Sequence, residues 1–170
     1  GVHPIRTLFW MSFAAAEHSI TIANAYFVPD EIIRSILMEK ARAGVTVRIL
    51  APSNHTDMPP VQWAGRYYYG EMIAAGVQIA EYQPTMLHSK FIIIDGVWNI
   101  IGSANMDVRS KELNEENVFA IDDTVLADEL TEAFDADMPK ATLMTPAAWH
   151  KRGAWWRLKE AFSALFTEQF

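Results

Sequence analysis

A histidine and a lysine two positions apart, His88 and Lys90, are the residues of this chain whose types and spacing best suit chemistry. An apolar run at residues 91–94 follows them and ends at Asp95, and such a run is typical of a buried strand. Side chains on a strand alternate between its two faces, so residues two apart point the same way. The imidazole and the ammonium are therefore predicted to share one wall, with Asp95 where the strand ends.

Further polar residues follow a second apolar run. After a turn at residues 95–96, this run returns toward the first and delivers Gly102, Ser103 and Asn105. Lysine supplies a compact positive charge for a phosphoryl oxygen, Ser103 and Asn105 supply neutral donors, and Gly102 lets the backbone approach an anion. Each residue taken alone is more often structural. Together, at fixed spacing around two apolar strands, they favour phosphate chemistry.

The histidine has a chemical role in such a set. A free imidazole can attack phosphorus or carry a proton near neutral pH, so His88 is the candidate nucleophile or proton carrier. This chemistry needs no metal and no other cofactor, and the spacing of the five histidines is not typical of a metal site. A histidine nucleophile works best when its second ring nitrogen donates to a carboxylate. Glu116 is the candidate, because it precedes an apolar run at residues 117–121 that suits a neighbouring strand.

The spacing of these residues resembles a known signature. His-x-Lys, four residues, Asp, six residues and Gly-Ser-x-Asn is the pattern of the phospholipase D superfamily, and it matches from His88 through Asn105 without a departure. The resemblance covers about residues 18–135. Its flanking segments are similar to bacterial cardiolipin synthases at residues 25–31, 44–50, 55–57, 75–84 and 105–110, and at Leu113, Asn114 and Glu116.

The resemblance implies a role for each site residue. His88 would attack the phosphodiester phosphorus to give a phosphohistidine, or would protonate the departing alcohol. The phosphoryl oxygens of the transition state would be held by Lys90, Ser103 and Asn105. Asp95 is usually structural in this family and supports the motif from the strand end. Glu116 matches the carboxylate that orients the imidazole.

The implied activity is that of a cardiolipin synthase-like phosphatidyl transferase acting on phospholipid phosphodiesters. Lipid-synthesising relatives carry two copies of the motif, whereas this chain carries one and begins at Gly1. We therefore expect the C-terminal half of a two-motif enzyme, completed by a second half-domain on the parent chain or by a homodimer mate. Three alternatives remain: a hydrolytic phospholipase D, a single-motif homodimeric nuclease and a non-catalytic interaction half.

Composition limits the partners. The net charge of −7 disfavours nucleic acid, whose binding usually rests on a basic surface. The chain has no cysteine, so disulfides and thiolate metal sites are excluded. No stretch approaches the roughly 20 apolar residues that span a bilayer. The expected location is the bacterial cell membrane, reached peripherally or through an anchor outside this chain.

The order of elements predicts the fold. Strands are expected at residues 19–27, 45–50 and 77–82 beside the motif hairpin, and helices at 30–43, 61–75 and 123–138. This alternation predicts an α/β fold with a mixed, mostly parallel sheet and helices on both faces.

A division of the chain follows from the same pass. Residues 1–140 are expected to form the catalytic half-domain, and residues 141–170 a linker and a C-terminal amphipathic helix. That helix carries tryptophans beside Lys and Arg at residues 149–159. The pattern suits a helix lying on anionic lipid and equally a helix docked on the second half-domain.

Overall fold

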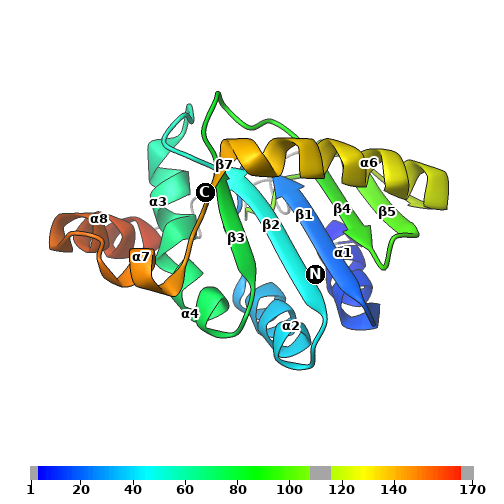
Figure 1. Cartoon of the computed structure of the whole chain (residues 1–170), viewed down its shortest axis with the longest axis horizontal. Coiled ribbons are helices and arrows are strands. Elements are labelled where there is room, and N and C mark those ends of the chain that lie inside the picture. The colour runs from blue at the N-terminus through cyan, green and yellow to red at the C-terminus, as the bar shows by residue number, and fades with distance from the viewer. Residues whose placement is uncertain (1–3, 108–115, 166–170) are drawn as a thin grey trace.

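A seven-stranded sheet forms the centre of the computed structural model, which describes residues 4–107 and 116–165 (Figure 1). The strand order is β6-β5-β4-β1-β2-β3-β7. The strands are β1 Ser19–Asn24, β2 Thr46–Pro52, β3 Gln78–Tyr82, β4 Lys90–Ile94, β5 Trp98–Gly102, β6 Val118–Asp122 and β7 Ala141–Leu143. Residues 108–110, Leu113 and Asn114, which contribute to the resemblance, lie outside the described residues.

The α/β fold and the mixed sheet are confirmed, but the expectation of a mostly parallel sheet is wrong. Among the described strands, β1, β2 and β3 pair in parallel, while β4, β5, β6 and β7 all join antiparallel. For β4 and β5, the reason is the length of the connection. A parallel pair needs a crossover of a dozen or more residues, whereas the turn between β4 and β5 is too short for anything but a hairpin.

That turn has the backbone of a tight hairpin. Asp95 and Gly96 both adopt positive φ, at 53° and 67°, and the N–H of Val97 donates to the carbonyl of Ile94 at 3.1 Å. Two successive residues of positive φ match the right-handed twist of the flanking strands. The turn expected at residues 95–96 therefore sets the register in which Phe91 faces Ile101 and Ile92 faces Ile100.

Helices cover both faces of the sheet (Figure 1). The larger core cluster packs Ile22, Ile49 and Ile92 of the strands against α1 Pro4–Ala15, α2 Glu31–Arg42 and α4 Tyr69–Ala74. On the opposite face, Phe134 of α6 Thr124–Asp137 packs against Ala23, Leu50 and Ala80. The remaining helical segments are α3 Pro59–Tyr67, η1 Met138–Lys140, α7 Pro146–His150 and α8 Ala154–Ala164.

The structure differs from the sequence expectations in two helices. Helix α1 was not expected, yet it buries Phe9 and Phe13 in the main core. The helix expected at residues 61–75 divides at Tyr68 into α3 and α4. Gly65 lies against the carbonyl of Phe27 and Gly70 against the indole of Trp149, so the two halves pack on different neighbours.

The C-terminal region joins the same body. Residues 141–143, expected in a linker, form β7 and pair with β3. Trp149 of α7 is buried in the main core cluster. Among the described residues, no helix combines the length and the apolar character needed to cross a membrane.

Candidate active site

Lys90 is the first residue of β4, and its register partner is Asn24, the last residue of β1. Ile92 and Ile94 continue the same face of β4 into the main core, as the period of two requires. His88 lies two residues before β4 and is exposed, while its neighbour Leu87 is buried against the α6 side. The histidine is thus held at the end of the sheet where β4 begins, by an apolar residue next to it.

The structure brings His88 and Lys90 together. The Lys90 ammonium donates to the backbone carbonyl of His88 at 3.0 Å and lies 3.4 Å from both ring nitrogens, Nδ1 and Nε2. Burial lowers the pKa of Lys90, and the carboxylates of Glu116 and Asp107 oppose that shift. The lysine therefore lies within the electrostatic influence of two carboxylates and has an imidazole beside it.

Gly102 and Ser103 are held against the segment before β6. A side chain at Gly102 would collide with the carbonyl of Asn117 and the backbone of Val118, so glycine is required by strand packing here. The Ser103 N–H donates to the Asn117 carbonyl at 3.0 Å, and the Ser103 hydroxyl accepts from the Asn117 N–H at 3.1 Å. These bonds place Ser103 beside the residue that follows Glu116.

Asn24 fixes the segment that carries Asn105. Its side-chain oxygen accepts the N–H groups of Tyr26, at 3.2 Å, and of Met106, at 3.1 Å. The Met106 carbonyl in turn accepts from the N–H of Val28 at 3.1 Å. Asn105 is buried at the start of this connection. The end of β1 and the end of the motif are therefore joined through one buried amide.

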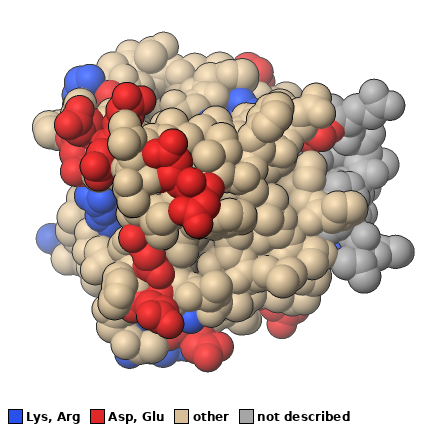
Figure 2. Space-filling view, turned by 90° about the vertical axis from the view of Figure 1, so that its right-hand side faces the viewer, with Lys and Arg blue, Asp and Glu red and all other residues tan. Residues whose placement is uncertain are grey.

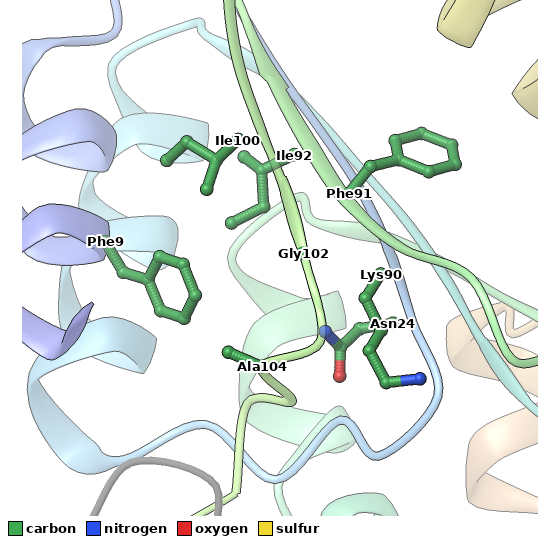
Figure 3. Close-up of a pocket in the computed structure, with 8 residues that line it drawn as sticks. All are labelled: Phe9, Asn24, Lys90, Phe91, Ile92, Ile100, Gly102 and Ala104. Atoms are coloured by element: carbon green, nitrogen blue, oxygen red, sulfur yellow. The ribbon is translucent and has the colours of Figure 1, made fainter. Parts of the chain in front are cut away.

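A small pocket opens between these strands (Figure 3). Lys90 and Asn24 lie side by side at its polar end, Phe9, Ile92 and Ile100 form an apolar wall, and Phe91 points to the other side of the strand. The lining residues are Phe9, Asn24, Lys90, Phe91, Ile92, Ile100, Gly102 and Ala104. The polar end is the part that suits an anion.

Asp95 lies away from this group, at the other end of β4. Its carboxylate accepts three backbone N–H groups, from Glu17 at 2.8 Å and from His18 and Ser19 at 2.7 Å each. Burial opposes the charged form, but these donors and the nearby His18 outweigh it and lower the pKa of Asp95. With roughly 3.3 Å per strand residue, about 16 Å of β4 separates the carboxylate from Lys90.

Glu116 lies near Lys90, as the effect on the pKa of that lysine indicates. The polar contacts of the His88 ring within the described part of the chain are with Lys90, and the ring donates no hydrogen bond to Glu116 there. Glu116 lies two residues before β6, the strand beside β5. Its role toward the imidazole stays a prediction.

Sequence reasoning missed Asn24 and Asp107. Asn24 is a polar residue at the end of a strand that is otherwise almost wholly buried, and that contrast was the available signal. Asp107 is also buried, and its charge acts on both Lys90 and Tyr26. The Tyr26 hydroxyl donates to Asp57 at 2.6 Å. Burial first, then Asp57 and Asp107, raise the pKa of Tyr26 to about 12.

Other clusters and hollows lie outside this site. Within residues 4–107 and 116–165, no group of three or more His, Cys, Asp or Glu side chains could hold a metal ion. An apolar hollow lies at the Asp95 end of the sheet, between α1 and the β4–β5 hairpin, with Leu8, Met11 and Trp98 among its lining residues. His55 is an exposed loop residue whose Nδ1 lies 3.5 Å from the Ser53 hydroxyl.

The arrangement of residues at the end of the sheet where β4 begins suits the binding of a phosphodiester. The Lys90 ammonium lies beside an imidazole that solvent can reach, and Ser103 and the buried Asn105 follow β5, the strand that pairs with β4. Cationic and neutral donors stabilise the charge that builds on phosphoryl oxygens during displacement.

The comparisons with known proteins agree with this chemistry. A family model described as "Cardiolipin synthase, PLD-like domain" matches residues 11–138. The probable cardiolipin synthase YwiE of Bacillus subtilis (strain 168) is 39% identical over 161 residues, which are 94% of this chain and 32% of that protein. The chain therefore spans about a third of the length of the curated relatives that it matches.

Solved structures share the fold. Phosphatidylserine synthase from Haemophilus influenzae Rd KW20 superimposes with a TM-score of 0.76 at 12% identity, over 98% of this chain and 45% of that one. Nuc from Salmonella typhimurium, a phospholipase D family member, gives 0.71 at 21% identity, over 82% of this chain and 90% of that one. At these identities, the two likenesses show the fold alone.

Proposed function

This chain belongs to the family of phospholipase D-like domains of cardiolipin synthases, and we propose that it forms one half of the active site of a phosphatidyl transferase. The observation that carries the proposal is the position of Lys90, whose ammonium lies beside the exposed His88 imidazole at the end of the sheet where β4 begins. Ser103 and Asn105 follow the end of β5, the strand that pairs with β4. A cation, neutral donors and a nucleophile are the groups that phosphoryl transfer uses.

The reaction proceeds in two displacements at phosphorus. In the first, a ring nitrogen of His88 forms a bond to phosphorus while the bond to the leaving alcohol oxygen breaks, which gives a phosphohistidine. In the second, the oxygen of an acceptor alcohol attacks, its proton returns to the group that protonated the leaving alcohol, and the phosphorus–nitrogen bond breaks, which frees the imidazole. Lys90, Ser103 and Asn105 hold the phosphoryl oxygens in both steps. Glu116 orients the imidazole, and Asp95 supports β4 from its far end.

A second half-domain supplies the proton for the leaving alcohol. The surface around β6 suits its docking, because Phe119 and Val125 are each 66% exposed and Ile121 is also exposed. These residues follow Glu116 in the chain and lie on the outer strand of the sheet and at the start of α6. Exposed apolar groups of this size, next to an incomplete site, are typical of a contact surface.

Membership of the family supports a phospholipid as the substrate and a membrane surface as the place of the reaction. The donor is a phospholipid such as phosphatidylglycerol, and the product is cardiolipin with release of glycerol. A lipid donor has to be reached in a bilayer, which requires at least peripheral attachment.

A graft provides the test. The matching 161 residues of the Bacillus subtilis relative are replaced by this chain, and the purified graft is incubated with phosphatidylglycerol. We expect cardiolipin and glycerol by mass spectrometry, with a loss of about a thousandfold or more in His88→Ala. His55→Ala, at an exposed loop histidine, serves as the control and should keep full activity.

Other outcomes would favour other functions. Phosphatidic acid without cardiolipin would identify a hydrolase, because water rather than an alcohol then resolves the intermediate. Cleavage of a labelled oligonucleotide by the 170-residue chain, as a dimer on size-exclusion chromatography, would identify a nuclease. Undiminished cardiolipin formation in His88→Ala would contradict the role proposed for that residue.

A further inference from the structure

Helix α8 presents an apolar stripe to solvent. Trp155, Leu158, Phe162 and Leu165 are 65%, 60%, 62% and 77% exposed. Their spacing of three, four and three residues puts them on one side of the helix. Glu160 and Ser163, on the other side, are buried where α8 packs along α3. The helix is therefore attached by its polar side and leaves its apolar side outward, which is the reverse of a helix that covers a core.

The charges beside the stripe are positive. Residues 141–165 contain four basic residues and one acidic residue, Glu160, which is fully buried. Lys151, which follows α7, and Arg157, in the first turn of α8, are exposed. The side of the molecule away from α8 carries more Asp and Glu than Lys and Arg (Figure 2). A chain with a net charge of −7 thus keeps a positive region beside its exposed tryptophan.

Ion pairs hold the stripe in a defined orientation. Glu160 accepts from Arg66 of α3 at 3.2 Å and from Arg152 at 2.9 Å. Arg66 also binds Glu81 of β3, so the helix is connected to the central sheet. The Lys159 ammonium lies 4.9 Å from the ring centres of both Trp63 and Trp156. These contacts hold α8 in one orientation on α3, whereas a flexible tail would have no fixed orientation.

The position of α8 separates it from the surface around β6. Helix α8 packs on α3, beyond the β3 side of the sheet, whereas β6 is the strand at the opposite edge (Figure 1). A half-domain that completes the site at His88 and covers Phe119 meets the β6 side. The stripe on α8 therefore needs another occupant.

We propose that α8 is a membrane-docking helix whose stripe of Trp155, Leu158, Phe162 and Leu165 enters the surface of an anionic bilayer. Lys151 and Arg157 bind the lipid phosphates. The Glu160 ion pairs fix the angle of α8, and so the angle at which the candidate active site around His88 faces the lipid. Apolar residues with a tryptophan and adjacent basic groups are the composition that partitions into such an interface. This inference deepens the proposed function, since it names the surface that reaches the lipid.

Vesicle sedimentation with the 170-residue chain tests the proposal. Phosphatidylserine mixed with phosphatidylcholine supplies anionic charge without the proposed donor lipid. We expect binding to the mixed vesicles and little to phosphatidylcholine alone, with release as salt rises. The double variant Leu158→Glu/Phe162→Glu should bind at least about tenfold more weakly, because the free energy gained by burying these two apolar side chains in the bilayer is then lost. Lys151→Glu/Arg157→Glu should lose the preference for anionic vesicles.

Two controls separate this inference from others. Met11→Glu places the same charge at a residue of α1 that is 67% exposed, and it should bind as the wild type does. His88→Ala should also bind normally, so a failure of the proposed catalysis leaves this test intact. Wild-type binding by Leu158→Glu/Phe162→Glu, or equal binding to neutral vesicles, would overturn the proposal. A wild-type chain that forms a dimer, together with a double variant that is a monomer, would also overturn the proposal, because the stripe would then join two copies of the chain.

Discussion

The ammonium of Lys90 lies 3.4 Å from each ring nitrogen of His88 and 3.0 Å from the His88 carbonyl. One flexible side chain therefore touches both the backbone and the ring of the residue proposed to attack phosphorus. The same ammonium lines the polar end of the pocket beside Asn24 (Figure 3). In the proposed reaction, this positive charge binds a phosphoryl oxygen during attack.

Replacing Lys90 should therefore damage the reaction more than the fold. In the grafted enzyme, we expect Lys90→Met to lower kcat by about a hundredfold or more, since one charged donor to the transition state is lost. Lys90→Arg should recover little, because a planar guanidinium does not occupy the place of a compact ammonium. Lys140→Met, at an exposed lysine that pairs with Asp137, is the control. Equal kcat for Lys90→Met and the control would exclude the assigned contact.

Asp95 should contribute to stability in a way that depends on pH. The pKa of its carboxyl is lowered in the folded chain, so its contribution is present above the ordinary aspartate pKa and lost as pH falls through the lower folded value. We expect Asp95→Asn to cost about 1 kcal/mol near neutral pH, a small figure because the site is partly solvated. Asparagine suits the positive φ of this turn, so the hairpin should persist.

Urea unfolding followed at several pH values measures the effect of Asp95. The difference between wild type and Asp95→Asn should shrink as pH falls below the ordinary aspartate pKa toward the lowest pH at which the chain still folds. A difference that stays constant down to that pH would mean that the charge is not responsible.

Tyr26 should ionise late. Burial is the first cause of its raised pKa of about 12, and the hydrogen bond to Asp57 adds to it. A raised pKa of a phenol means that the folded state holds its proton more tightly, so stability falls as pH rises above the ordinary value near 10. The difference between the absorbance titrations of the wild type and of Tyr26→Phe reports the ionisation of Tyr26 alone. Asp57→Asn should move the midpoint down only in part, and an unchanged midpoint would show that Asp57 has no influence.

Glu160 should hold α8 on α3. Glu160→Gln leaves Arg66 and Arg152 beside a neutral amide in a buried place, which we expect to cost about 3 kcal/mol. Helix α8 should then exchange its amide hydrogens faster, while β1 and β2 stay protected. The matched control is Glu71→Gln, because Glu71 pairs with Arg34 at 2.8 Å and is 47% exposed. Its cost should stay below about 1 kcal/mol. Unchanged exchange in α8 would argue against the clamp.

Much of the fold was readable from periodicity. Residues two apart in the apolar runs face one side of a strand, so the strand that carries Lys90 and the hairpin at Asp95 and Gly96 could be predicted. Helix α2 was predicted from the Asp30 cap and Gly44, and its Asp30 side chain accepts the N–H of Ile33 at 2.9 Å. These signals are local, because each depends on residues only a few positions apart.

The balance of strand directions was not readable in the same way. The antiparallel joining of β4 to β1, at Lys90 and Asn24, unites segments far apart in the chain. Helix α1 showed no strong pattern, and its Phe9 and Phe13 became core residues only because the sheet presents a face to them. The same is true of Trp149, which is buried although the sequence around it suits an exposed helix.

The amino-acid sequence by itself determined the motif, the phosphate chemistry it suits and the local elements that carry it, because spacing along a strand decides which side chains share a face. The tertiary structure decided that Asn24 pins the end of the motif, that Asp95 binds residues 17–19 and that Glu160 is buried between two arginines. These pairings join residues that lie between 8 and 94 positions apart. Only the packing of the folded chain brings such residues within hydrogen-bond distance.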